Sequence, residues 1–166
     1  MTPKMLLTLA IEPAMTLLPE KMNTPDAIRM MVAIAKQESD LKHRHQVGGP
    51  AHGPWQFERN GGMKGVLNHP ATRAHARRAC ELMIYDPDDL DDVFAGLEHN
   101  FVLAAVFARL LLWTLPAPLP QNQYEGFAQY IDAWRPGAWF RGNEEKRLGL
   151  KRRWVVSWAA GEVALT

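Results

Sequence analysis

The segment from Thr24 to Ser39 constrains the fold more than any other part of this chain. It opens with Thr24-Pro25-Asp26, which combines a capping hydroxyl, a proline suited to the first helical turn and an acid favoured by the helix dipole. Apolar residues then recur at positions 28, 31, 32 and 35, the i, i+3, i+4, i+7 spacing of one helix face. The pattern predicts an amphipathic helix that begins after Thr24 and buries this face.

Glu38 lies at the end of that apolar face. At about 100° per residue it shares the side of Met31 and lies one turn beyond Ile34, whereas Asp40 points about 160° away from it. Most acids near helix ends reach solvent. A carboxyl on a buried face instead loses water, which favours its protonated form, and a protonated acid near neutral pH is what general acid catalysis requires. Glu38 is therefore the candidate catalytic residue.

Length and composition limit the function classes. The 166 residues suit one domain, 1–166, and the 47% apolar and 22% charged content is that of an ordinary globular protein. A formal charge of +1 gives no bulk attraction to nucleic acid. The single cysteine, Cys80, excludes an internal disulfide and suits a small core residue. No glycine-rich phosphate loop is present, so we expect no cofactor.

The rest of the chain reads as helices and loops, with no run of alternating strands, so the fold class is mainly α. The longest apolar run, 101–115, is interrupted by Arg109 and is shorter than the roughly 20 residues that span a bilayer, so it predicts a buried helix and no membrane span. The expected elements are one or two short helices in 5–18, a loop over 41–65 with a short hairpin near 55–57, a helix in 70–84, one helix from about 88 to 113, a helix in 126–133, a turn at 134–137 and a last helix around 154–159.

Two groups of residues could form metal sites, but each has a simpler interpretation. A calcium loop that starts at Asp86 would need glycine and glutamate where Asp91 and Leu97 stand, so the five nearby aspartates favour a solvated helix start. Three histidines, at positions 43, 45 and 52, could bind zinc, but no HExxH or CxxC spacing accompanies them. We expect loop or surface histidines and no metal.

The loop after Glu38 contains an aromatic residue beside an amide, Trp55-Gln56. A sugar ring has flat apolar faces edged with hydroxyls, so a groove that binds it uses aromatic platforms next to amide side chains. Trp55 and Gln56 are therefore candidate substrate-binding residues.

Three blocks together resemble a known family. Residues 35–39, 53–56 and 130–137 are similar to the Glu-Ser, Gly-Leu-Met-Gln and Tyr-Asn-Ala-Gly motifs of the soluble lytic transglycosylases, which are lysozyme-fold enzymes that cut peptidoglycan. The order and spacing of the three blocks agree with those of the family motifs, and the resemblance covers about residues 25 to 140. Two departures are Pro54-Trp55 in place of Leu-Met and Ile131-Asp132 in place of Asn-Ala. The single domain looks more like the version carried by tailed bacteriophages than the large bacterial enzymes.

The resemblance implies a lysozyme-like fold of the goose-type lysozyme and lytic transglycosylase kind. It also implies that Glu38 is the catalytic acid and base, that Ser39 and Gln56 contact the sugar or its N-acetyl group, and that Tyr130 stands close to the Glu38 carboxyl. Peptidoglycan glycan strands are then the expected partner, along with phage virion proteins, and the protein is expected to act as a monomer.

Three functions are compatible with the sequence. The first is lytic transglycosylation of the β-1,4 bond between N-acetylmuramic acid and N-acetylglucosamine, which needs one carboxyl and gives a 1,6-anhydro product. The second is a muramidase that hydrolyses the same bond with Glu58 or Asp132 as the second carboxylate. The third is a non-catalytic wall-binding or virion structural protein. No signal peptide is recognised, so we expect synthesis in the bacterial cytoplasm, followed by packaging in a virion or release to the periplasmic wall.

Overall fold

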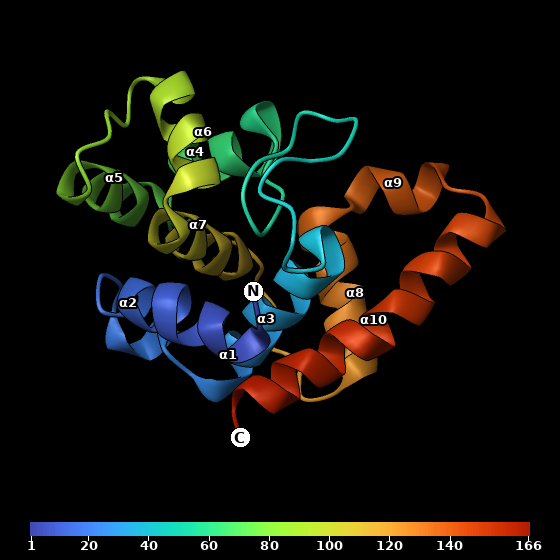
Figure 1. The fold of residues 1–166 in the computed structure, drawn as a ribbon. Helices are drawn as coiled ribbons and strands as arrows, with labels where there is room; N and C mark the ends of the chain where they lie inside the picture. Colours follow the sequence, from blue (N-terminus) through green and yellow to red (C-terminus); the bar gives the residue numbers. More distant parts are fainter.

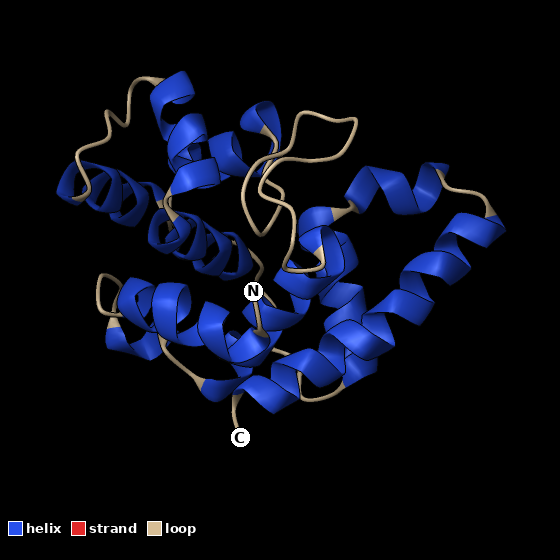
Figure 2. Cartoon of the chain, viewed as in Figure 1, coloured by secondary structure: helices blue, strands red, loops and turns tan.

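The computed structural model describes residues 1–166, apart from the side chains of Pro136 and Ala138. The predicted mainly helical fold is confirmed, and within the described residues the backbone forms helices and loops but no β-strand (Figures 1 and 2). The helical elements are α1 (Pro3–Leu6), the π-helical turn η1 (Leu7–Ile11), α2 (Glu12–Met15), the 3₁₀ turn η2 (Glu20–Met22), α3 (Pro25–Ser39), the π-helical turn η3 (Arg59–Met63), α4 (Lys64–Asn68), α5 (Arg73–Leu82), α6 (Leu90–His99), α7 (Phe101–Trp113), α8 (Gln123–Trp134), α9 (Pro136–Arg141) and α10 (Glu144–Ala164).

Helix α3 begins where its sequence predicts. The Thr24 side-chain oxygen accepts a hydrogen bond from the Ala27 N–H at 3.2 Å, which satisfies one of the free donors of the first turn. At the other end Asp40 adopts a left-handed conformation, with φ of 53°, and Lys36 donates to its carboxylate. Asp40 thus closes the helix on a side away from Glu38.

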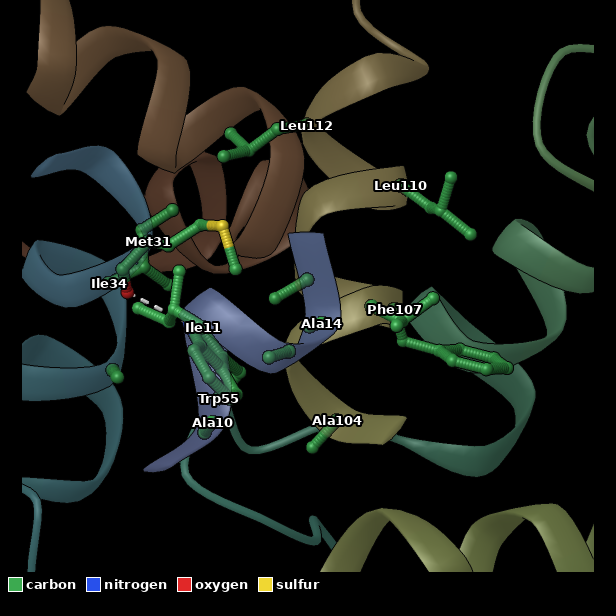
Figure 3. Packing of buried hydrophobic residues seen from close by; sticks show 14 of the residues in the cluster. Ala10, Ile11, Ala14, Met31, Ile34, Trp55, Ala104, Phe107, Leu110 and Leu112 are labelled. Carbon is green, nitrogen blue, oxygen red and sulfur yellow. Dashed lines mark hydrogen bonds between the residues drawn. The ribbon is translucent and has the colours of Figure 1, made fainter. Parts of the chain in front are cut away.

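The core forms where α3 and α7 meet the N-terminal helices. Helix α10 packs along α3, and α7 packs against η1, α2, α5 and α6. Figure 3 shows Ile11, Met31 and Ile34 close together on one side of α7 and Phe107 pointing away from them on the other side, and all four are fully buried. Because α7 is buried on nearly every side, its sequence is apolar all round rather than along one stripe.

The single helix predicted from about 88 to 113 is wrong, because the chain bends at Asn100. That residue leaves the helical conformation, with φ of −108° and ψ of 98°, and its side-chain oxygen caps α7 by accepting from the N–H groups of Val102 and Leu103. The chain therefore bends by 109° between α6 and α7. Within the described residues no single helix has the length and apolar character to cross a bilayer, although this bent pair passes the same test together.

Other boundaries also differ from the sequence expectation. The chain is helical without a break from α1 through α2, and the predicted turn at 134–137 is limited to Arg135, because α9 starts at once after it. Helix α10 is longer than expected and starts directly after its cap Asn143, whose side chain accepts from the Lys146 N–H at 2.9 Å. The long loop ends earlier than predicted, at Glu58, where η3 begins.

Candidate active site

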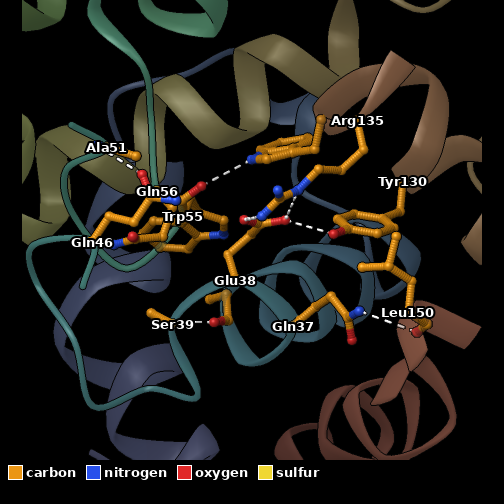
Figure 4. Close-up of polar contacts among 12 residues, drawn as sticks. Gln37, Glu38, Ser39, Gln46, Ala51, Trp55, Gln56, Tyr130, Arg135 and Leu150 are labelled. Atoms are coloured by element: carbon orange, nitrogen blue, oxygen red, sulfur yellow. Dashed lines mark hydrogen bonds and ion pairs between the residues drawn. The ribbon is translucent and has the colours of Figure 1, made fainter. Parts of the chain in front are cut away.

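Glu38 is buried at the last turn of α3, with only 2% of its side chain exposed. Two residues that follow much later in the chain donate to its carboxylate (Figure 4). The Tyr130 hydroxyl donates to Oε1 at 2.6 Å, and Arg135 donates through Nε to Oε1 at 3.0 Å and through Nη2 to Oε2. Helix α8 carries Tyr130, and Arg135 directly follows that helix. The packing of α8 thus completes the surroundings of Glu38.

These contacts correct one part of the sequence prediction. Glu38 is buried, but it is not an isolated acid in an apolar setting, because its carboxylate is paired with a guanidinium. Burial alone would lower the pKa of Arg135, but hydrogen bonding to Glu38 and the negative charge of Glu38 outweigh it and raise that pKa. Burial raises the pKa of Tyr130, and the charge of Glu38 raises it further. At neutral pH, therefore, Tyr130 is a protonated donor and Arg135 is a cation.

Glu38 lies on the wall of a pocket of about 440 Å³, a volume typical of small-molecule sites. The wall contains both acids and bases as well as two aromatic residues and several glycines. Its lining residues are Glu38, Gln46, Ala51, Gln56, Phe57, Glu58, Gly61, Gly62, Gly65, Leu111, Ala133, Trp134, Arg135, Gly137 and Arg141. The pocket therefore joins the end of α3 to the long loop and to the α8–α9 junction.

A tight turn places Gln56 in this wall. The Gln56 N–H donates to the Gly53 carbonyl at 3.0 Å, and the Gln56 side-chain Nε2 donates to the same oxygen at 2.8 Å. Gly53 has φ of 77°, and a Cβ there would come within 2.2 Å of the Leu97 carbonyl oxygen, so the turn requires glycine. Gln56 itself has φ of 51°. The turn thus brings the amide side chain to the same pocket as Glu38.

Trp55 lies in the core rather than in the pocket. It is fully buried, its Nε1 donates to the Met31 carbonyl at 2.8 Å, and its own carbonyl accepts from Trp134 Nε1 at 2.9 Å (Figures 3 and 4). A fully buried ring offers no exposed face to a sugar, so this position does not support the predicted role of Trp55 as a binding platform. Its ring instead anchors the loop on α3, which holds the neighbouring Gln56 in place.

Ser39 does not face the pocket either. Its hydroxyl donates to the Ala35 carbonyl at 2.9 Å and accepts from the Leu41 N–H at 3.3 Å, and the residue is only 2% exposed. The Ser39 hydroxyl therefore satisfies backbone groups at the end of α3. This position does not agree with the predicted direct contact between Ser39 and substrate.

The two candidate second carboxylates have different positions. Glu58 is exposed and belongs to the pocket wall that Glu38 also lines. Asp132 is exposed on α8 and is not among the residues that line this pocket. Of the two, only Glu58 shares a cavity with Glu38.

Sequence reasoning missed the role of Arg135. It precedes a proline, a position where helical conformation is disfavoured, so the sequence did contain a signal that α8 ends there, five residues after Tyr130. Nothing in the sequence pattern indicated that its guanidinium turns back to a carboxylate 97 positions earlier. Trp134, whose N–H holds the loop, was likewise assigned only to a turn.

A larger hollow elsewhere is a weaker candidate. It measures about 680 Å³ but is more open, and its lining comes from a single stretch, 143–152, at the start of α10. The pocket at Glu38 instead joins three parts of the chain and contains a buried acid, which is the usual character of a functional site. Comparisons with protein-family models, with curated proteins and with solved structures found no match to this chain, so the roles of these residues rest on their geometry.

Proposed function

We propose that this protein is a peptidoglycan lytic transglycosylase with a lysozyme-like fold. One observation carries the proposal: a single buried carboxyl, Glu38, receives the Tyr130 hydroxyl at 2.6 Å and lines a pocket with the Gln56 amide. A buried, oriented acid beside an amide is the arrangement needed to cleave a glycosidic bond next to an N-acetyl sugar without a second carboxylate. The similarity of three sequence blocks to that family supports the same reaction.

In the proposed reaction Glu38 acts first as an acid and then as a base. Its proton passes to the oxygen that bridges N-acetylmuramic acid and N-acetylglucosamine, and the bond between that oxygen and the anomeric carbon breaks as positive charge develops on the muramic ring. The resulting Glu38 carboxylate then takes the proton of the muramic 6-hydroxyl, whose oxygen bonds to the anomeric carbon. The product is a 1,6-anhydro ring, and no water is consumed.

Arg135 must move for this reaction to start. In the free protein Arg135 pairs with both oxygens of Glu38, so its guanidinium covers the group that must reach the glycosidic oxygen. The Arg135 side chain is 34% exposed and lies on the pocket wall, so an entering glycan strand can displace it toward solvent. Tyr130, which is buried, would stay and keep Oε1 oriented. Once the cation has moved, both Glu38 oxygens are free to face the glycosidic bond.

A muramidase is the second candidate, because Glu58 lines the same pocket as Glu38. In that reaction Glu58 would activate water or attack the anomeric carbon, and the product would carry a reducing end. A non-catalytic wall-binding or virion protein is the third, favoured by the same Glu38–Arg135 pair if that pair never opens. The two enzymes and a wall-binding protein take peptidoglycan strands as partner, whereas a virion structural protein binds other virion proteins; all agree with a phage protein packaged in a virion or released to the wall.

The test compares wild type, Glu38→Gln and Glu58→Gln on purified peptidoglycan, with mass spectrometry of the products. We expect anhydro-ended fragments, one water lighter than hydrolysis products, and a loss of at least about 100-fold in Glu38→Gln. Glu58→Gln should remain active. Reducing ends together with an inactive Glu58→Gln would establish the muramidase instead. Binding without any fragment release, unchanged in Glu38→Gln, would establish the non-catalytic protein.

A further inference from the structure

Three potential metal ligands meet where the long loop packs on α6. His45 Nδ1 lies 3.3 Å from Glu98 Oε2, and His52 Nε2 lies 3.2 Å from the same oxygen. One ligand atom from each residue lies within 4.8 Å of the others. The two histidines are held opposite one another by an antiparallel bridge, and their rings are 4.7 Å apart. This cluster is separate from the residues that line the Glu38 pocket.

The hydrogen bond of the second nitrogen of His52 determines what Nε2 can do. His52 Nδ1 lies 3.1 Å from the Phe94 carbonyl oxygen. A carbonyl only accepts, so Nδ1 must carry a hydrogen, which leaves the Nε2 lone pair of a neutral imidazole facing Glu98. Two lone pairs that face each other at 3.2 Å repel, so either a proton or a metal ion must lie between them. A backbone carbonyl on the other nitrogen is also the usual support of a metal-binding histidine.

We propose that His45, His52 and Glu98 bind a divalent transition-metal ion, with Zn²⁺ as the ion of choice. Two imidazoles and one carboxylate suit zinc, whereas Ca²⁺ and Mg²⁺ prefer oxygen ligands only. Zinc bonds of about 2.0–2.2 Å in a tetrahedron put neighbouring ligand atoms about 3.3 Å apart. The two distances to Glu98 already have this value. The His45 side chain is 56% exposed, and a small rotation of it would bring its ligand nitrogen to the tetrahedral distance from His52 Nε2. Water would complete the fourth position.

The cluster is closely packed on the α6 side. The His52 ring stacks on Phe94, with centroids 3.8 Å apart and planes 5° from parallel. One turn further along α6, the Leu97 carbonyl contacts Gly53, and Glu98 follows. Residues 94, 97 and 98 thus form one helix face on which the loop rests. Two of the three ligands are only 16% and 21% exposed, which reduces competition from bulk water.

A bound ion would tie the loop to α6 just before the turn that carries Gln56. His52 is adjacent to Gly53, whose carbonyl holds the Gln56 side chain, and the His52 and Phe57 backbones exchange hydrogen bonds at 2.9 and 2.8 Å. The ion is therefore a structural clamp for one wall of the Glu38 pocket. It takes no part in the proposed bond cleavage, so the two proposals can fail separately.

The sequence expectation of no metal considered the three histidines of the loop and found no zinc spacing. The third ligand instead comes from α6, 53 positions after His45. Of the three loop histidines, His43 is exposed and is not a member of the cluster, so His43→Ala provides a matched control.

The test titrates chelator-treated full-length protein with Zn²⁺ against a coloured competing chelator, and with Co²⁺ by visible absorption. We expect one equivalent bound with a Kd on the order of 1 µM or tighter, together with the intense visible bands of four-coordinate Co²⁺. His52→Ala and the isosteric Glu98→Gln should each weaken binding at least about 10-fold, and His43→Ala should not. Zn²⁺ should also raise the melting temperature of wild type and His43→Ala more than that of the other two.

Two results would overturn the proposal. One is a Kd for Zn²⁺ weaker than roughly 100 µM in the wild type, which is no tighter than scattered surface histidines provide. The other is equal binding by wild type, His52→Ala and Glu98→Gln when circular dichroism shows that all are folded. In either case a proton occupies the gap between His52 and Glu98, and the cluster is an ion pair.

Discussion

Arg135 donates to both carboxylate oxygens of Glu38 across 97 positions of sequence, so the most buried acid of the pocket is covered by a cation from the α8–α9 junction. The pair has two consequences. It offsets the cost of burying the Glu38 charge, and it controls access to the one group that the proposed chemistry requires. Arg135 is therefore the first residue to test.

The first prediction is that Glu38 and Arg135 are coupled in stability. In a double-mutant cycle of Glu38→Gln and Arg135→Met, we expect a coupling free energy of about 0.5–3 kcal/mol from urea unfolding, because each single change leaves a partner without its charged neighbour. Arg141 lines the same pocket but is exposed, so the Glu38–Arg141 cycle is the control and should give a coupling near zero. Equal coupling free energies in the two cycles would mean that the direct contacts between Glu38 and Arg135 add no stability of their own.

The second prediction concerns Tyr130 and rests on the proposed function. Tyr130→Phe removes the hydroxyl that donates to Glu38 Oε1 while keeping the buried ring, which stacks on Trp154 at 5.0 Å. We expect kcat on peptidoglycan to fall about 10- to 100-fold with little change in KM, since the hydroxyl orients the acid rather than binds the sugar. Tyr124, which is 79% exposed, offers the matched control Tyr124→Phe. Equal activity of the two variants would remove Tyr130 from the mechanism.

The third prediction is that Trp55 stabilises the fold. Trp55→Ala removes a fully buried ring and leaves the Met31 carbonyl without its donor, so we expect a loss of about 3–5 kcal/mol in the free energy of unfolding. Phe140→Ala, at a residue 78% exposed, should change stability by less than about 0.5 kcal/mol. If Trp55→Ala kept its stability and lost only affinity for glycan, the platform role expected from the sequence would be right after all.

The fourth prediction concerns Cys80, which is fully buried on α5. Burial, with a smaller contribution from Asp92, raises the pKa of its thiol from 9.0 to about 12. The native thiol should therefore react with a thiol reagent at pH 8 only as fast as the protein unfolds. Reaction at the rate of a free peptide thiol would show that the residue is accessible.

The same pKa shift predicts a dependence of stability on pH. Between pH 9 and about 12 the unfolded thiol loses its proton while the native thiol keeps it, so the stabilising effect is complete below pH 9 and is lost as pH rises through this window. Over that range wild type should lose more stability than Cys80→Ala, measured by urea unfolding at each pH. If the free energy of unfolding falls equally with pH in wild type and Cys80→Ala, the raised pKa of Cys80 is excluded.

Local signals in the sequence were sufficient for α3 and for the burial of Glu38. A cap at Thr24 and the periodic apolar positions depend on contacts within a few residues, so they can be read from neighbouring positions alone. The same kind of signal was present at Asn100 but was outweighed by the continuous apolar run on both sides of it, so the bend between α6 and α7 was missed. A continuous apolar run indicates that a segment is buried, but a buried segment can be one helix or two.

Only the tertiary structure decided what surrounds Glu38. The pairing with Arg135, the anchoring of Trp55 on Met31 and the meeting of His45 with Glu98 all join residues that are far apart in the chain. Periodicity gives the side of a helix on which a residue lies, but the partner on that side depends on how α8 and the long loop pack against α3 and α6. The sequence by itself therefore determined a helical chain with one buried acid, and packing determined that this acid is held by a cation at the wall of a pocket.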